Sequence, residues 1–146
     1  MNRRLEEWML HWFPTVGRLL MALLFIDAGF GKMDNFVATV QYAASAGVPQ
    51  PEMAVFLATI VELAGGLFLL IGFKAREAAM VLSTAVVLYS LFFHLNINDQ
   101  LQLTMLLKNC GIIGGLLYVI AFGAGKLSFD LIGEDEKIRK LTTSSM

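Results

Sequence analysis

The chain has 146 residues, of which 57% are hydrophobic and 16% are charged, with a mean hydropathy of +0.67 and a net charge of −1. A typical water-soluble domain is nearer half apolar and about a quarter charged, so this composition indicates an integral membrane protein. The near-neutral charge gives no reason to expect nucleic acid as a partner, and the single cysteine, Cys110, excludes an intrachain disulfide.

Four apolar blocks, each close to the length that a helix needs to cross a bilayer, dominate the chain. They show no strand-like alternation of apolar and polar residues, which argues against a membrane β-barrel. We therefore predict an all-α fold, a four-transmembrane-helix bundle with a short amphipathic N-terminal helix and a short helical outer loop. The predicted spans cover about 15–33, 53–72, 77–94 and 103–122, in a domain over 1–130 that a charged tail over 131–146 follows.

The N-terminal segment Met1–Phe13 combines arginines with tryptophans, which is typical of a helix lying at the membrane interface. With the apolar run Thr15–Ala28 that follows, this basic start resembles a signal peptide, but Asp27 interrupts the end of the run and no A-x-A site precedes Lys32, so we expect no cleavage. The first span then carries three charged residues. Arg18, near its start, could extend to the membrane surface or serve a function. Lys32, at the other end, leans back into the bundle, and Asp27 lies roughly opposite Arg18, where it could contact another subunit.

The second span carries one carboxylate, Glu62, near its middle. A charge at that depth is costly and should face the inside of the bundle, where it needs a partner. Gly65 and Gly66 beside it would let another helix approach closely. Before this span, Phe36–Ala46 is too short and too polar to cross a membrane, so we expect it to be a helix that covers the outer end of the bundle.

The last two spans add polar residues at the same end as Lys32. His94 ends the third span, as an interfacial histidine or one that handles protons. Lys108 and Asn109 lie about two turns into the fourth span, and a buried amide such as Asn109 needs hydrogen-bond partners. Their neighbour Cys110 is expected to be a buried, inert thiol, with redox chemistry as the alternative.

Counting about 1.5 Å of rise per residue brings these polar groups to a similar depth, with Glu62 just beneath them. Because Glu62 and Lys32 lean toward each other, we predict that they form a buried pair, with Asn109 completing the hydrogen bonds and Lys108 as the second choice of cation. The predicted ligand-binding pocket thus comprises Lys32, Glu62, His94, Lys108 and Asn109. Secondary candidates are Arg18, Asp27 and Cys110, and no metal site is predicted.

The basic residues near the helix ends are concentrated on the side that holds both termini. Since cytoplasmic loops carry the excess of lysine and arginine, both termini are predicted to be cytoplasmic. The residues on that side are Arg3, Arg4, Lys74, Arg76, Lys126, Lys137, Arg139 and Lys140.

Short motifs occur in a fixed order between about Gly17 and Asp130. They are Gly17-Arg18-Leu19-Leu20, Ala28-Gly29-Phe30-Gly31-Lys32, Ala46-Gly47-Val48-Pro49, Glu62-Leu63-Ala64-Gly65-Gly66, Gly72-Phe73, His94, Lys108-Asn109, Gly114-Gly115-Leu116-Leu117 and Ser128/Asp130. This set resembles the DoxX family of small membrane proteins, apart from Asp27, where an apolar residue is usual. The resemblance implies a four-helix fold in the bacterial inner membrane. Its relatives include a quinone-reducing thiosulfate oxidoreductase subunit and proteins linked to thiol and oxidative stress.

Three functions are compatible with the sequence. The first is a redox-associated subunit, linked to quinone or to thiol and sulfur chemistry, that binds quinone among its polar residues and receives electrons from a redox protein partner. The second is a non-enzymatic structural or assembly protein in a homo- or hetero-oligomer, and the third is a small transporter or proton relay. The sequence does not decide whether the chain is an enzyme, and quinone is the one cofactor that it suggests.

Overall fold

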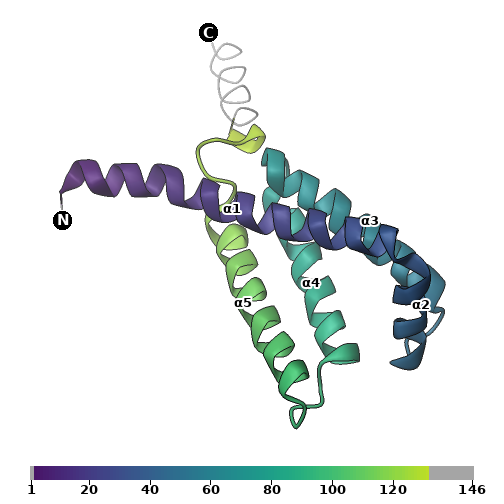
Figure 1. The fold of residues 1–146 in the computed structure, drawn as a ribbon. Helices are drawn as coiled ribbons and strands as arrows, with labels where there is room; N and C mark the ends of the chain where they lie inside the picture. Colours follow the sequence, from purple (N-terminus) through teal and green to yellow (C-terminus); the bar gives the residue numbers. More distant parts are fainter. Residues whose placement is uncertain (1, 132–146) are drawn as a thin grey trace.

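The computed structural model describes residues 2–131, and within this range the chain contains helices and no strand (Figure 1). The predicted tail over 131–146 therefore lies outside the described residues except for Leu131. Four of the helices are long and apolar enough to cross a membrane, which confirms the predicted all-α membrane fold. In chain order the helices are α1 (Arg3–Asp34), α2 (Phe36–Ser45), α3 (Pro51–Ile71), α4 (Ala75–Phe93) and α5 (Gln100–Phe122).

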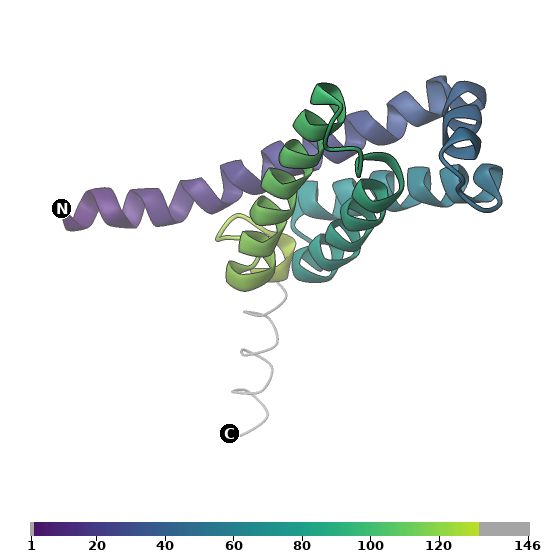
Figure 2. The same ribbon diagram turned by 90° about the horizontal axis from the view of Figure 1, so that it is seen from below.

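The spans pack as two helix pairs. α1 lies along α3, and the short α2 joins them at one end of the pair (Figures 1 and 2). α4 packs against α5, and contacts between α3 and α4 connect the two pairs. Tight connections between consecutive spans make them antiparallel neighbours. As a result, Lys32, α2 and the α4–α5 loop come to one end of the bundle, and the α3–α4 turn and the segment after α5 come to the other.

α1 passes through Pro14 without interruption, whereas the sequence predicts a separate N-terminal helix before a first span that begins at about residue 15. Residues 3–13 are helical as expected, but they continue directly into the first span. Proline removes one N–H donor and can bend a helix without ending it, because neighbouring turns keep their hydrogen bonds. With 32 residues, α1 is about 48 Å long at 1.5 Å per residue. Its N-terminal half extends past the other helices (Figure 1).

The other helix ends follow local signals. α5 begins at Gln100, three residues before the predicted start, because the Asp99 carboxylate accepts hydrogen bonds from the backbone N–H of Leu101 at 2.8 Å and of Gln102 at 3.3 Å. α3 begins with Pro51, whose missing N–H costs nothing in the first turn. It ends at Gly72, which adopts a left-handed conformation with φ of +70°.

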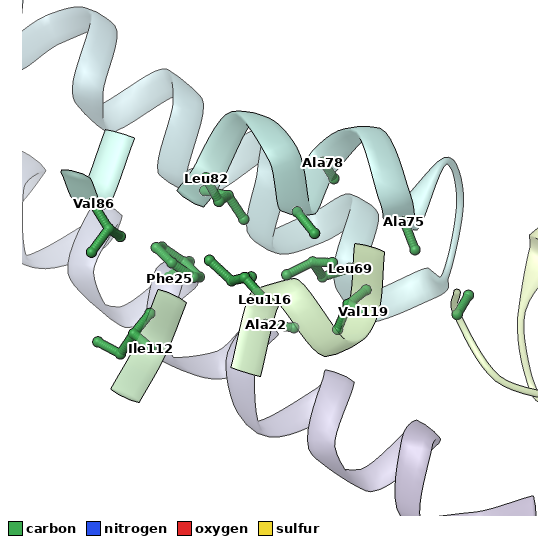
Figure 3. Close-up of a cluster of buried hydrophobic side chains, with 12 residues drawn as sticks. Ala22, Phe25, Leu69, Ala75, Ala78, Leu82, Val86, Ile112, Leu116 and Val119 are labelled. Atoms are coloured by element: carbon green, nitrogen blue, oxygen red, sulfur yellow. The ribbon is translucent and has the colours of Figure 1, made fainter. Parts of the chain in front are cut away.

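The core is a narrow column of apolar side chains between the two helix pairs (Figure 3). Phe25 of α1, Leu69 of α3, Leu82 of α4 and Leu116 of α5 are its largest fully buried members. Outside this column, many large apolar side chains on all four spans are exposed, including Leu20 and Leu107 at 63% each. On a chain that crosses a membrane these side chains face lipid, so close helix contacts must come from packing rather than from the hydrophobic effect.

α1 and α3 approach each other closely at Gly66. A methyl group there would lie 3.2 Å from the backbone oxygen of Ala22 and 3.2 Å from the backbone nitrogen of Ile26, neither of which can move aside alone. We expect Gly66→Ala to lower the free energy of unfolding by about 1–3 kcal/mol through overpacking. Gly114→Ala in α5, where nothing lies within 4 Å, is the control and should cost nothing. Equal midpoints in a denaturant titration of the two variants would refute this account.

Candidate functional site

Lys32 and Glu62 form a bidentate ion pair inside the bundle. The Lys32 Nζ donates to Glu62 Oε1 at 2.9 Å and to Oε2 at 2.8 Å. Glu62 is only 2% exposed, so its carboxylate is screened from lipid and water. The pair forms because α1 and α3 run antiparallel and each side chain leans toward the N-terminus of its own helix. The structure therefore contains the predicted pair.

Tyr89 of α4 completes this group of polar side chains. The Lys32 Nζ lies 5.6 Å from the centre of its ring, within the range of a cation–π contact. Its hydroxyl lies near the Glu62 carboxylate but has no hydrogen-bond partner of good geometry among residues 2–131. A buried hydroxyl without a partner is unusual, because it has lost its hydrogen bonds to water. Tyr89 was not among the predicted pocket residues. Comparing its depth in the membrane with that of Glu62, as was done for the other polar residues, would have identified it.

The prediction that Asn109 completes the hydrogen bonds of the Lys32–Glu62 pair is wrong. Its Nδ2 instead donates to the Ser90 Oγ at 3.0 Å, and Ser90 donates to the Val86 carbonyl at 2.8 Å. Lys108, the second choice of cation, does not bond to Glu62 either. The reason is that α5 packs against α4 rather than α3, which brings its polar residues to a different wall of the bundle.

A cavity of about 620 Å³ connects these groups, and we call it the Glu62 cavity. Its walls are mostly apolar side chains of α1, α3 and α4. α2 covers one end, where Tyr42 stacks on Phe93 with ring centres 5.0 Å apart. The polar residues that line it include all five predicted pocket residues together with Tyr89: Lys32, Glu62, Tyr89, His94, Lys108 and Asn109.

His94 occupies the position just after α4 and lines this cavity. Its Nδ1 is buried and has no hydrogen-bond partner within the described chain. Partial burial and then the positive charge of Lys108 lower the pKa of His94 below its usual value. A neutral imidazole, able to accept or donate a proton, is therefore favoured at pH 7.

Arg18, a secondary candidate, is only 2% exposed. Its Nη2 donates to the Leu127 carbonyl at 2.8 Å, because the segment after α5 folds back over this end of the bundle. Its charged group therefore lies at the end of the bundle where the first span begins, covered by protein. Arg18 lies at the opposite end from Glu62 and takes no part in the Glu62 cavity.

The two remaining candidates lie on the surface. Asp27 is exposed, away from the Glu62 cavity as its position on the helix predicted. Cys110 is a free, exposed cysteine, so the expected buried thiol is wrong. Because α5 turns this position away from α4, the side chain meets lipid instead of the core. No group of three His, Cys, Asp or Glu side chains capable of holding a metal ion occurs among the residues that the structure describes.

Comparison with known proteins agrees with this architecture. The DoxX family profile matches residues 13–95. The chain is 36% identical to inner membrane protein YqjF of Escherichia coli strain K12 over 115 residues, which cover 79% of this chain and 87% of that protein. It is 32% identical to inner membrane protein YphA of the same organism over 120 residues, covering 79% and 86%. No solved structure matches the chain significantly. The chain therefore belongs to the DoxX family of integral inner-membrane proteins.

Proposed function

We propose that this protein is a redox-associated membrane subunit that binds a quinone head group in the Glu62 cavity. The observation that carries the proposal is the unpartnered Tyr89 hydroxyl, buried in a cavity lined by a bidentate ion pair. Ligand cavities typically measure about 300–1,000 Å³ and combine apolar walls with a few polar groups. The Glu62 cavity fits this description in both volume and lining.

A quinone suits the chemistry of these walls. Its ring and isoprenoid tail are apolar, so it reaches the bundle from the bilayer, and its carbonyl oxygens accept hydrogen bonds. The Tyr89 hydroxyl lies near the Glu62 carboxylate without a hydrogen bond of good geometry, so it can turn to donate to a ligand, and Lys32 carries a donor proton beyond those that it gives to Glu62. His94 lines the cavity just after the end of α4, where its imidazole could exchange protons with the surface.

Reduction of a quinone to a quinol needs two electrons and two protons. The side chains around the cavity can bind and exchange the protons. The electrons would come from a partner redox protein that carries flavin, iron or thiol groups, because this chain has one cysteine and cannot form a two-thiol relay by itself. The proposal allows this partner to lie on either face of the membrane. From the distribution of lysine and arginine, we also propose that both chain termini are cytoplasmic.

Short-chain ubiquinone should stabilise the purified protein against heat, and the stabilisation should depend on Tyr89. We expect Tyr89→Phe to weaken ubiquinone binding about tenfold, the effect of one lost hydrogen bond of roughly 1.4 kcal/mol. The matched control is Tyr118→Phe, which removes a hydroxyl from an exposed tyrosine of α5 that does not line the Glu62 cavity. Thermal unfolding across a ubiquinone titration measures both variants. Identical titration curves for them and for the parent protein would overturn the proposal.

The alternative is a structural or assembly protein in which the ion pair fixes the register of α1 against α3. It is favoured by the fact that Lys32 already engages both carboxylate oxygens of Glu62. Buried polar pairs of this kind can specify one helix arrangement over others. Crosslinking in membranes that captures one constant protein partner, with no response to quinone, would support this alternative.

A further inference from the structure

A second cavity, of about 1080 Å³, lies at the end of the bundle opposite the Glu62 cavity. We call it the Arg76 cavity. It is open to the surface and is bordered by the N-terminal half of α1, the last turns of α5, the first turn of α4 and the segment that follows α5. The N-terminal half of α1 passes beside the end of α5 at this position (Figures 1 and 2). Three of the described basic residues, Lys74, Arg76 and Lys126, also lie at this end.

The polar side of the Arg76 cavity is positively charged. Lys74, Arg76 and Lys126 line it, against the carboxylates Glu77 and Asp130. Asp130 is already engaged, because its Oδ1 accepts from the Lys74 backbone N–H at 2.6 Å and its Oδ2 from that of Ala75 at 3.0 Å. Its charge is thus held by the N-terminus of α4. The charged side chains that line the cavity therefore include more cations than unengaged carboxylates.

The backbone beside these cations also offers hydrogen-bond donors. Gly123 and Gly125 both have positive φ, +81° and +79°, which turns the chain sharply after α5. Arg76 lies against this turn, since a methyl group on Gly123 would be 3.2 Å from the Arg76 Nε. The backbone N–H groups of Ala124 and Lys126 donate no hydrogen bond to another described residue. Cationic side chains next to free N–H groups form an environment that binds anions.

The other side of the cavity is apolar. Leu10 and Phe13 come from α1, and Tyr118 and Phe122 come from α5. They are 71%, 58%, 69% and 71% exposed, so large apolar surfaces lie directly beside the basic groups. A free phosphate ion would use the cations and leave this surface without a partner. A molecule with an anionic head and hydrocarbon chains would match both sides.

We propose that the Arg76 cavity binds an anionic phospholipid, with its phosphate between Arg76 and Lys126 and its acyl chains against Phe13 and Phe122. Basic pockets between transmembrane helices, at the membrane surface, are known to hold anionic lipid head groups in this way. The site is independent of the Glu62 cavity, with which it shares no lining residue. It would anchor the projecting half of α1 to the rest of the bundle.

Native mass spectrometry of the full chain, titrated with phosphatidylglycerol and separately with phosphatidylcholine, tests the proposal. We expect one phosphatidylglycerol to be retained in preference to phosphatidylcholine. The exposed pair Arg76→Gln/Lys126→Gln should weaken this binding tenfold or more, since each cation near an anionic membrane surface contributes roughly fivefold. The control pair Arg3→Gln/Arg4→Gln removes the same charge outside the cavity and should change binding less than twofold. Equal loss in both pairs, equal retention of both lipids, or competition by millimolar inorganic phosphate alone would overturn it.

A photo-crosslinking residue identifies the occupant in intact membranes. With p-benzoylphenylalanine at position 122, we expect an adduct with the mass of a phospholipid, reduced by Arg76→Gln/Lys126→Gln. A crosslink to the chain's own residues 132–146, which include Glu134, Asp135 and Glu136, would show that this segment fills the cavity and would refute the lipid. A crosslink to a separate protein would refute it equally.

Discussion

Glu62→Gln is expected to lower the free energy of unfolding by about 3 kcal/mol, the lower end of the cost of breaking a buried pair, because it leaves the partly buried ammonium of Lys32, whose side chain is 24% exposed, without a counterion. The size of the effect follows from burial. Glu62 is 2% exposed, and Lys32 bonds both of its carboxylate oxygens. An unpaired charge in such a position costs more than the pair itself contributes. Steric-trapping or denaturant unfolding in a defined bilayer mimic measures the difference.

Two further variants separate the lost pair from other effects of the substitution. Glu52→Gln makes the same change in the first turn of α3, where the side chain is exposed, and should change the free energy of unfolding by less than about 0.5 kcal/mol. Lys32→Met/Glu62→Gln removes the unpaired cation and should recover most of the stability, since uncharged side chains of similar volume replace buried pairs well. A double variant no more stable than Glu62→Gln would contradict this explanation.

Gly72→Ala is expected to destabilise the protein by about 2–5 kcal/mol, for two reasons that add. Gly72 has φ of +70°, a conformation that alanine adopts only with strain. In addition, a methyl group there would coincide with the Arg18 guanidinium. Arg18 cannot easily move away, because it is buried and bonded to the Leu127 carbonyl. The free energy of unfolding of the variant measures the sum.

Gly47→Ala isolates the first of these two contributions. Gly47 has a similar φ of +77°, but nothing lies within 4 Å of its would-be methyl group. Its substitution should therefore cost only about 1–2 kcal/mol, the strain of a left-handed alanine. The difference between the two variants gives the cost of displacing Arg18, and Arg18→Ala should reduce that difference. Equal effects of Gly47→Ala and Gly72→Ala would mean that Arg18 is free to move.

The Lys32–Glu62 pair could be predicted because it depends on quantities that the sequence contains. The length of each apolar block gives the depth of a residue in the membrane, and the direction of each helix gives the lean of its side chain. Both residues also belong to helices that the short α2 holds side by side. The depth of each residue and the direction of its side chain were sufficient to predict the contact between Lys32 and Glu62. They were also sufficient to predict that His94 and Asn109 line the same cavity.

The partner of Asn109 and the surroundings of Arg18 could not be obtained in this way. Asn109 bonds to Ser90 because α5 packs on α4, and the choice of neighbour depends on how the four helices are arranged about the bundle axis. Arg18 is buried by a segment more than a hundred residues away, whose return path is set by the positive φ of Gly123 and Gly125. The pattern of apolar residues along the sequence predicts neither how a helix is rotated about its axis nor where the segment after α5 folds back.

Photolabelling with an azido-ubiquinone in native membranes, followed by peptide mapping, tests most directly the proposal that the Glu62 cavity binds quinone. The account predicts saturable labelling of the α3 and α4 segments that line this cavity, around Val61 and Tyr89. Excess unlabelled ubiquinone should suppress the labelling, and Tyr89→Phe should weaken it whereas Tyr118→Phe should not. Labelling that does not saturate, or that falls only on the exposed apolar surface of α5, would contradict the account.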